Sequence, residues 1–247
     1  MPALVGQPAH PTVHTHTETQ RLKVVTPRAL GVFALALAVA LLLPSPARAD
    51  WLLSAYVGGT KTTSNTLEIT PAAGATVSVA SVEYEGRAFK APPYYGYRFG
   101  WTPDGGHIGV EGEFTHAKAI ATNLTSPDLT AFQLSHGLNF ILGNVVYRSS
   151  PACSGRCVFA LRGGAGVTYP HVEAMFRGRE TQDYEYAGFG AQGGVGVELT
   201  VAPHVAIVAD ARVTHARVRA DLIDGARLAG PFTSFHADIG IGWHSSR

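Results

Sequence analysis

From Trp51 onward the chain alternates between apolar side chains and small or polar ones, in eight segments of roughly ten to fifteen residues. The last segment shows the pattern most clearly. One parity holds Phe235, Ala237, Ile239, Ile241 and Trp243, and the other holds His236, Asp238, Gly240 and Gly242. Because successive side chains of a strand point to opposite faces, each segment is predicted to be a strand with one apolar and one polar face.

Two architectures can use such strands. A soluble sandwich would bury the apolar parity and solvate the other, but here the second parity carries too much charge and glycine for a uniformly solvated surface. A transmembrane barrel places lipid outside and a polar lumen inside. After residue 49 no apolar run reaches about 18 residues, which excludes a helical membrane protein. The predicted fold class is therefore all-β, an eight-stranded antiparallel transmembrane β-barrel whose closed wall, without free edges, predicts a monomer.

The predicted strands are residues 51–59, 88–101, 108–118, 132–148, 158–171, 186–201, 205–217 and 232–243. The segments between them alternate between short and long. Barrels of this class keep short turns in the periplasm and long loops outside, and an even number of strands then places both termini in the periplasm. Residues 76–84 also alternate, so they either extend the first long hairpin above the membrane or form the second strand themselves; the first option is preferred because it keeps residues 92–101 in the wall.

The first 49 residues are predicted to be an N-terminal extension and a signal peptide that is removed. A cationic region with Arg21, Lys23 and Arg28 precedes an apolar run over residues 29–43, and Ala47-Arg48-Ala49 forms a small-x-small cleavage site. A non-cleaved anchor is the alternative. Residues 50–247 then form one outer-membrane β-barrel domain.

Net charge and the two cysteines bear on the binding partners and on the compartment of the protein. The whole chain has a formal charge of +1, and without the predicted leader it is about −2, which gives no indication of nucleic-acid binding. Cys153 and Cys157 lie in one short turn. In the oxidising compartment that a leader implies, they are expected to form a disulfide; a two-cysteine metal clip is the alternative, without a second ligand pair to accompany it.

The polar parity predicts the content of the lumen. A narrow eight-stranded barrel is filled by its side chains, so these cations and anions are expected to form internal ion pairs and to leave no pore. They are poor catalytic candidates. The residues are Arg98, Glu111, Glu113, Asn139, Arg162, Gln192, Glu198, Asp210, Arg212 and Asp238.

The outward parity predicts a lipid face and a possible site. Its aromatic girdle comprises Tyr95, Tyr97, Phe99, Trp101, Phe159 and Trp243. His116, His136 and His171 share this parity near the predicted extracellular end, and residues 116 and 136 flank a loop almost symmetrically, so they are expected to face one another across paired strands. Together with Glu173 the three imidazoles could hold a divalent metal ion beside the lipid headgroups.

Other assignments remain open at this point. Histidines also sit at interfaces without a ligand, and a one-residue bulge would reverse the parity of any of these positions. Lys118, His215 and Arg217 have the chemistry of phosphate or sugar contacts. His107, His204 and His244 fall at the periplasmic side and are expected to be solvated only.

Several runs carry a resemblance to a known family: FKAPPYYGYR at 89–98, GEFTHAK at 112–118, SHGLNF at 135–140 with Tyr147-Arg148, and GAGVTYPHVE at 164–173. They resemble the outer-membrane β-barrel proteins grouped as lipid A oxidases. The resemblance implies an enzyme that uses dioxygen and a divalent metal ion to oxidise the proximal glucosamine of lipid A to 2-aminogluconate. Lipopolysaccharide and the lipids of the outer membrane would be its partners. The metal ligands named above rest on strand geometry and are not carried over from the family.

The run SHGLN at 135–139 is also similar to the His-x-Ser-Asn motif of outer-membrane lipid A deacylases. Leu138 occupies the position of their nucleophilic serine, and acyl transfer needs a hydroxyl. A deacylase mechanism is therefore rejected unless Ser135 substitutes, which strand parity opposes.

Three functions are compared. The first is a lipid A oxidase, which needs the three histidines on one external patch. The second is a non-enzymatic barrel of the OmpA/OmpW-like or surface-antigen type, which tolerates their scattering. The third, a transporter of small apolar molecules, is opposed by the predicted charges in the lumen.

Overall fold

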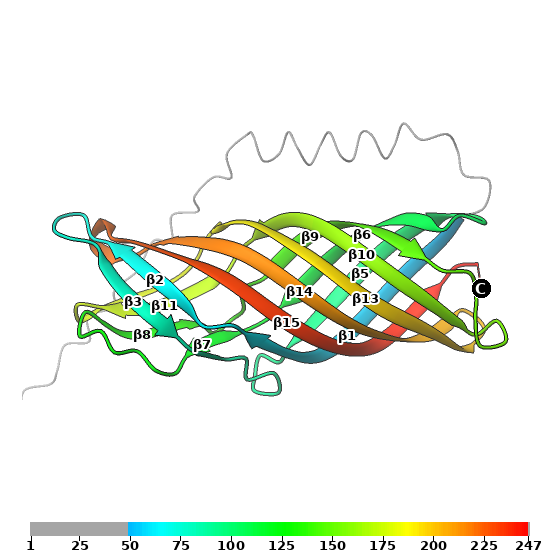
Figure 1. The fold of residues 1–247 in the computed structure, drawn as a ribbon, viewed down its shortest axis with the longest axis horizontal. Coiled ribbons are helices and arrows are strands. Elements are labelled where there is room, and N and C mark those ends of the chain that lie inside the picture. The colour runs from blue at the N-terminus through cyan, green and yellow to red at the C-terminus, as the bar shows by residue number, and fades with distance from the viewer. Residues whose placement is uncertain (1–48, 247) are drawn as a thin grey trace, which may run out of the picture. The chain divides into compact units, whose positions relative to one another are not determined.

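The structure, a computed structural model, describes residues 49–246. They form a closed eight-stranded antiparallel barrel, which confirms the predicted fold class. The wall runs β1-β5-β6-β9-β10-β13-β14-β15, and β15 pairs back onto β1 (Figure 1). The strands are β1 Ala49–Thr62, β5 Tyr95–Pro103, β6 Ile108–His116, β9 Phe140–Arg148, β10 Cys157–Thr168, β13 Gly188–Ala202, β14 Val205–Asp221 and β15 Arg227–His244. The rest of the predicted leader, residues 1–48, lies outside the described residues.

Seven further strands lie beyond one end of the barrel. β2 Asn65–Thr70 and β3 Val77–Val82 continue the sheet from the start of β15. A second sheet contains β4 Tyr84–Glu85, β7 Ala119–Ala121, β8 Leu129–Leu134, β11 His171–Phe176 and β12 Arg179–Tyr184. Figure 1 shows β2, β3, β8 and β11 together at the end opposite the C-terminus. We call this part, made of the seven strands and the adjoining ends of β14 and β15, the distal half, and the end with Ala49 and His244 the terminal end.

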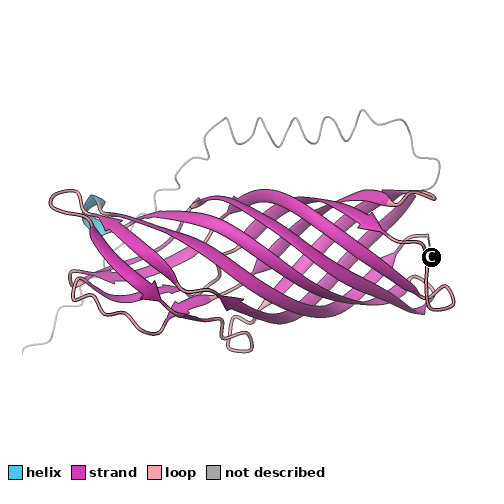
Figure 2. Cartoon of the chain, viewed as in Figure 1, coloured by secondary structure: helices cyan, strands magenta, loops and turns pink. Residues whose placement is uncertain are grey.

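The distal half confirms one strand prediction and corrects another. Residues 77–82 belong to the β2–β3 hairpin, so the preferred interpretation of 76–84 is confirmed. The second barrel strand begins at Tyr95 rather than at residue 88, since Pro92 and Pro93 have no N–H to contribute to a ladder. The single helical segment among the described residues is the short 3₁₀ turn η1 Ile223–Gly225 (Figure 2). None of the helical structure in residues 49–246 is long and apolar enough to span a membrane.

The outer wall between the two ends is an apolar belt. The predicted lipid-facing rings of Tyr97, Phe99, Phe159 and Trp243 are 49–56% exposed, as expected for side chains that face lipid. The belt extends from Phe159 on β10 to Tyr169, the residue after this strand, which at a rise of roughly 3.3 Å per residue and a tilt of about 40° spans about 25 Å. This matches the apolar band of about 25 Å that outer-membrane barrels present to the bilayer.

The lumen beneath this belt holds a network of ion pairs, as predicted. Arg98 contacts Glu113 at 3.0 Å and Asp210 at 2.6 Å. Arg212 contacts the same Glu113 at 2.6 Å and Asp238 at 2.8 Å. All ten residues predicted for the lumen are buried, but Asn139 lies in the loop before β9 and not in a strand of the wall. Sequence parity missed one cation, Arg148, which contacts Glu111 at 2.6 Å and Glu198 at 3.0 Å.

The interior of the distal half has the opposite character. It is an apolar core in which Phe232 packs against Tyr84 and Phe132, with ring centroids 5.4 and 6.2 Å apart. Side chains from both sheets complete it, among them Leu67, Ile69, Leu129, Leu134, Val172, Val218 and Leu228. The barrel is therefore filled with charge in one part and with hydrocarbon in the other, which supports the prediction that it has no open pore.

The terminal end corrects one histidine prediction. His244 is fully buried: its Nδ1 lies 2.6 Å from Asp50 and its Nε2 3.2 Å from Glu198. It therefore seals the lumen rather than being solvated. The thiols of Cys153 and Cys157 hydrogen-bond to each other, which raises the pKa of Cys157, but they are not joined in a disulfide.

Candidate metal centre

Two breaks in the barrel wall build the candidate site. The predicted strand 132–148 is divided into β8 and β9, and the predicted strand 158–171 into β10 and β11. Gly137 and Asn139 have φ of 94° and 37°, a left-handed backbone that ends a ladder. Asn139 Nδ2 donates to the carbonyls of His136 and Tyr169, at 3.1 Å each, and so joins the two breaks. From there β8 and β11 leave the barrel and pair with each other in the second sheet.

His136, His171 and Glu173 converge next to these breaks. One ligand atom from each lies within 4.8 Å of the others. Glu173 Oε1 is 3.1 Å from His171 Nδ1 and 3.6 Å from His136 Nδ1, and the two imidazole centroids are 4.7 Å apart. Two imidazoles and one carboxylate with open positions are the donor set of non-haem iron(II) oxygenases. The residues present therefore fit a divalent metal ion.

The cluster faces outward. Leu134, Val172 and Ala174 point into the apolar core, so the alternate positions Gln133 and Glu173, which are register partners, lie on the outer face. The side chain of His136 is 51% exposed, whereas those of His171 and Glu173 are 11% and 15% exposed. A ligand can therefore approach from the outside of the wall.

Burial and neighbouring side chains shift the pKa values of Glu173 and His171. Burial raises the pKa of Glu173, but hydrogen bonds from Ser135 Oγ and Gln133 Nε2, together with the nearby His171, lower it below its usual value. Burial lowers the pKa of His171 despite the opposing charge of Glu173. Metal binding needs deprotonated ligands, so an anionic carboxylate beside a neutral imidazole favours it.

Aromatic rings surround the cluster. The Tyr184 ring lies 4.4 Å from the His171 ring and is stacked with Tyr169 at 6.4 Å and an interplanar angle of 13°. Tyr169 and Tyr184 are 43% and 44% exposed. They lie where the apolar belt ends, the level at which amphipathic rings meet lipid headgroups.

His116 is not in the cluster. It is 4% exposed and stacks on Tyr95, with ring centroids 5.0 Å apart and an interplanar angle of 8°. The strand break removes the expected pairing of His116 with His136. A Cβ at Gly137 would lie 2.6 Å from His116 Cδ2, so His116 packs under the loop that carries His136 and is placed to position it.

Ser135 is a residue that parity reasoning rejected. Its Oγ lies 2.9 Å from His136 Nδ1 and 3.3 Å from His171 Nδ1, and it also contacts Glu173. The argument from strand parity is wrong here because regular strand geometry ends at Leu134. Gln133 and Tyr184 were missed as well; no sequence pattern marks them, since their role follows from the register of β11 with its two neighbours.

The predicted phosphate or sugar contacts are not gathered in one place. Lys118 is buried, and its Nζ donates to the carbonyls of Lys90 and Ala91, both at 3.0 Å, which fixes the loop before β5. His215 and Arg217 are exposed on the outer face of β14, and His215 Nδ1 lies 2.8 Å from Thr233 Oγ1. β14 is four strands away from β6 in either direction around the wall, so Lys118 cannot act with the other two.

A family profile agrees with the barrel architecture. The profile described as outer membrane protein beta-barrel domain matches residues 33–229. The fold is similar to that of neisserial surface protein A (11% identity, 79% of this chain and 98% of that chain, TM-score 0.40). It is also similar to that of OprG from Pseudomonas aeruginosa (12% identity, 82% of this chain and 99% of that chain, TM-score 0.42). The structure of AlkL in DMPC lipid bilayers is similar as well (12% identity, 82% of this chain and 93% of that chain, TM-score 0.44). The search of curated proteins found no match.

Proposed function

Since the chain belongs to the outer membrane protein β-barrel family and so resides in the outer membrane, we propose that it modifies lipid A. The reaction is a metal- and dioxygen-dependent oxidation of the proximal glucosamine to 2-aminogluconate. With the predicted orientation, the distal half faces the cell exterior and the cluster meets the outer leaflet.

One observation carries the proposal: His136, His171 and Glu173 gather within 4.8 Å on the outer wall, at the level where the apolar belt ends. A divalent ion bound there would supply Lewis acidity and a route for electrons to dioxygen. An amphiphile held in the leaflet reaches this site without entering the lumen, which is filled with ion pairs. The resemblance of the histidine-bearing runs to lipid A oxidases points to the same chemistry.

The chain's own residues divide the remaining tasks. Gln133 and Ser135 hold the carboxylate of Glu173 in place, and the rings of Tyr169 and Tyr184 offer an apolar wall for a sugar. Oxidation at C1 removes two electrons and two protons from the hemiacetal, as one hydrogen from C1 and one from its hydroxyl group. Water supplies the added oxygen, and dioxygen accepts the electrons and protons and leaves as hydrogen peroxide.

The test is mass spectrometry of lipid A from aerated cells with and without the chain. We expect a mass gain of one oxygen that disappears in His136→Ala and Glu173→Gln. His107→Ala is the matched control, because His107 is exposed at the opposite end of the barrel and its loss should leave the gain intact. Unaltered lipid A with added metal would contradict the proposal and favour a structural barrel of the OmpA/OmpW-like or surface-antigen type.

A second candidate is acyl-ester hydrolysis, favoured by the position of Ser135 Oγ between both imidazoles. The hydroxyl contacts Glu173 directly, however, and a nucleophilic serine needs an imidazole as its proton acceptor. The same spectra separate the two reactions. Hydrolysis removes the mass of an acyl chain and requires Ser135, whereas oxidation adds an oxygen and should persist, at a lower rate, in Ser135→Ala.

A further inference from the structure

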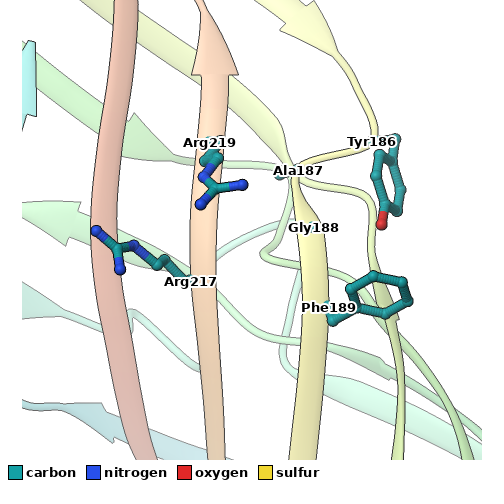
Figure 3. A pocket seen from close by; sticks show the side chains of 6 residues that line it. All are labelled: Tyr186, Ala187, Gly188, Phe189, Arg217 and Arg219. Atoms are coloured by element: carbon teal, nitrogen blue, oxygen red, sulfur yellow. The ribbon is translucent and has the colours of Figure 1, made fainter.

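A second feature of the outer wall lies on β13 and β14. Tyr186, Ala187, Gly188, Phe189, Arg217 and Arg219 line an open hollow of about 320 Å³ (Figure 3). In Figure 3 the rings of Tyr186 and Phe189 stand on one side of it, the Arg219 side chain lies on β14, and Arg217 extends towards the neighbouring strand β15. The hollow therefore has two aromatic rings on one side and the strand that carries both arginines on the other, with the Arg217 guanidinium turned towards β15.

The two guanidinium groups differ from the other arginines of the distal half. Arg87, Arg177, Arg179 and Arg227 each contact a carboxylate at 3.0–3.4 Å. Within residues 49–246, neither Arg217 nor Arg219 has a side-chain hydrogen bond or ion pair, although both are exposed. Glu185, on the adjoining segment, accepts a hydrogen bond from the backbone N–H of Asp221. Two neighbouring cations are thus left available for an external anion.

The position of the hollow indicates which anion. On the outer face of β14, Val213 belongs to the apolar belt, and the next outward positions are His215, Arg217 and Arg219. Phe189 and Tyr186 are 75% and 53% exposed, far more than rings facing water usually are. Apolar surface thus changes to cationic surface within a few residues, as expected at the boundary between acyl chains and headgroups.

We propose that this hollow binds the phosphate-bearing headgroup of an outer-leaflet glycolipid, namely lipid A. Arg217 and Arg219, on the same face of one strand and roughly 7 Å apart at the backbone, would contact phosphate oxygens through charge-assisted hydrogen bonds. Phe189 and Val213 would contact the first carbons of the acyl chains. A free phosphate would use the guanidinium groups but would gain nothing from the rings.

The hollow also has a place in the proposed reaction. β14 is two strands from β10 in the wall, which corresponds to about 10 Å, and His171 lies three residues beyond the end of β10 at Thr168. One glycolipid could therefore occupy both sites, with its phosphate at the arginines and its sugar at the metal cluster. This positioning role rests on the proposed function, whereas the binding itself does not.

The test is direct binding of lipid A to the full chain in detergent micelles, with folding of each variant checked by its heat-dependent electrophoretic mobility. We expect Arg217→Ala/Arg219→Ala to bind phosphorylated lipid A at least tenfold more weakly. Arg227→Ala, which removes a neighbouring cation that is paired with Asp221 at 3.2 Å, should bind within threefold of the wild type. If the double variant does not fold, the two single variants are compared in the same way, with at least a threefold loss expected from each.

Further binding measurements identify the ligand and separate this proposal from the proposed oxidation of lipid A. Dephosphorylated lipid A should bind the wild type as weakly as phosphorylated lipid A binds the double variant, and inorganic phosphate should compete poorly. Phe189→Ala should weaken lipid A binding severalfold without changing its dependence on salt. Equal binding by the double variant or equal binding of dephosphorylated lipid A would overturn the inference, as would inorganic phosphate competing as well as lipid A. Binding is measured without added metal ion, so a failure of the oxidation leaves this result unaffected.

Discussion

The membrane belt and the distal half share the strands β14 and β15, but the two parts are inverted with respect to each other. On β14 the inward positions Asp210 and Arg212 are charged in the belt, whereas Ala216 and Val218 are apolar in the distal half. The outward positions change in the opposite sense, from Ile207 to Arg217. Lipid selects the first arrangement and water the second, because each solvent decides which face must be apolar.

A site on the outer wall can form where the two arrangements meet. At the level where the faces exchange, polar groups can lie on the outer wall beside lipid. The metal cluster and the arginine hollow both lie at this level.

The largest loss of stability is expected from a change in the lumen. Arg212→Ala removes the guanidinium that pairs with Asp238 and leaves Glu113 with Arg98 alone, at sites that are fully buried. Breaking a buried pair typically costs about 3–5 kcal/mol. Urea unfolding in lipid vesicles, followed by tryptophan fluorescence, measures the loss. Arg217→Ala, on the outer face of the same strand, should change stability by less than about 0.5 kcal/mol; similar losses in both variants would refute the assignment of faces.

The second-largest loss of stability is expected from a change on the lipid face. Ile239 lies midway between Phe235 and Trp243 on β15 and is 57% exposed. Ile239→Arg places a charge near the middle of the belt, where it should cost about 2–4 kcal/mol. The reverse change in the distal half, Arg219→Leu, should be within about 0.5 kcal/mol. If Ile239→Arg is tolerated equally well, this part of the wall faces water.

The cluster should be sensitive to the residues that hold its carboxylate. Gln133→Ala removes a hydrogen bond to Glu173, and loss of such a supporting contact usually weakens metal affinity about 10–100-fold. Titration of the folded chain with Co²⁺, followed by its absorption spectrum, gives the affinity. Thr130→Ala, at an exposed position of the same strand, should bind Co²⁺ like the wild type, and equal affinity of the Gln133 variant would count against the assigned ligand set.

The smallest effect is expected for an ion pair of the distal surface. Arg227 contacts Asp221 at 3.2 Å, with both side chains more than half exposed. Since exposed pairs contribute only about 0.2–1 kcal/mol, Arg227→Ala should unfold at almost the wild-type urea concentration. A loss as large as that of Arg212→Ala would mean that the distal surface is buried in the membrane.

Strand parity predicted the belt well because a period of two holds wherever a ladder is unbroken. It placed Arg98, Glu111 and Arg162 in the lumen and Phe99 and Trp243 on the lipid side. It predicted the convergence of His136 and His171 for a partly wrong reason, since it assumed continuous strands. The left-handed backbone at Gly137 and Asn139 ends that continuity, and neither residue type requires this conformation.

The inversion itself was not predicted. Leu134 and Val172 are apolar residues at inward positions above the belt, and nothing in their local sequence says that the solvent outside has changed from lipid to water. Arg219 could have been found, because it repeats the outward parity of His215 and Arg217. Its lack of a partner among the described residues is a tertiary property that only the structure reveals.

The most direct test of the account is the metal content of the purified, folded chain after incubation with a divalent ion and removal of the excess, measured by inductively coupled plasma mass spectrometry. We predict one ion per chain for the wild type and for His107→Ala, and almost none for the double variant His136→Ala/Glu173→Gln. Equal metal content in all three proteins, or none in the wild type, would contradict a metal centre on the outer wall.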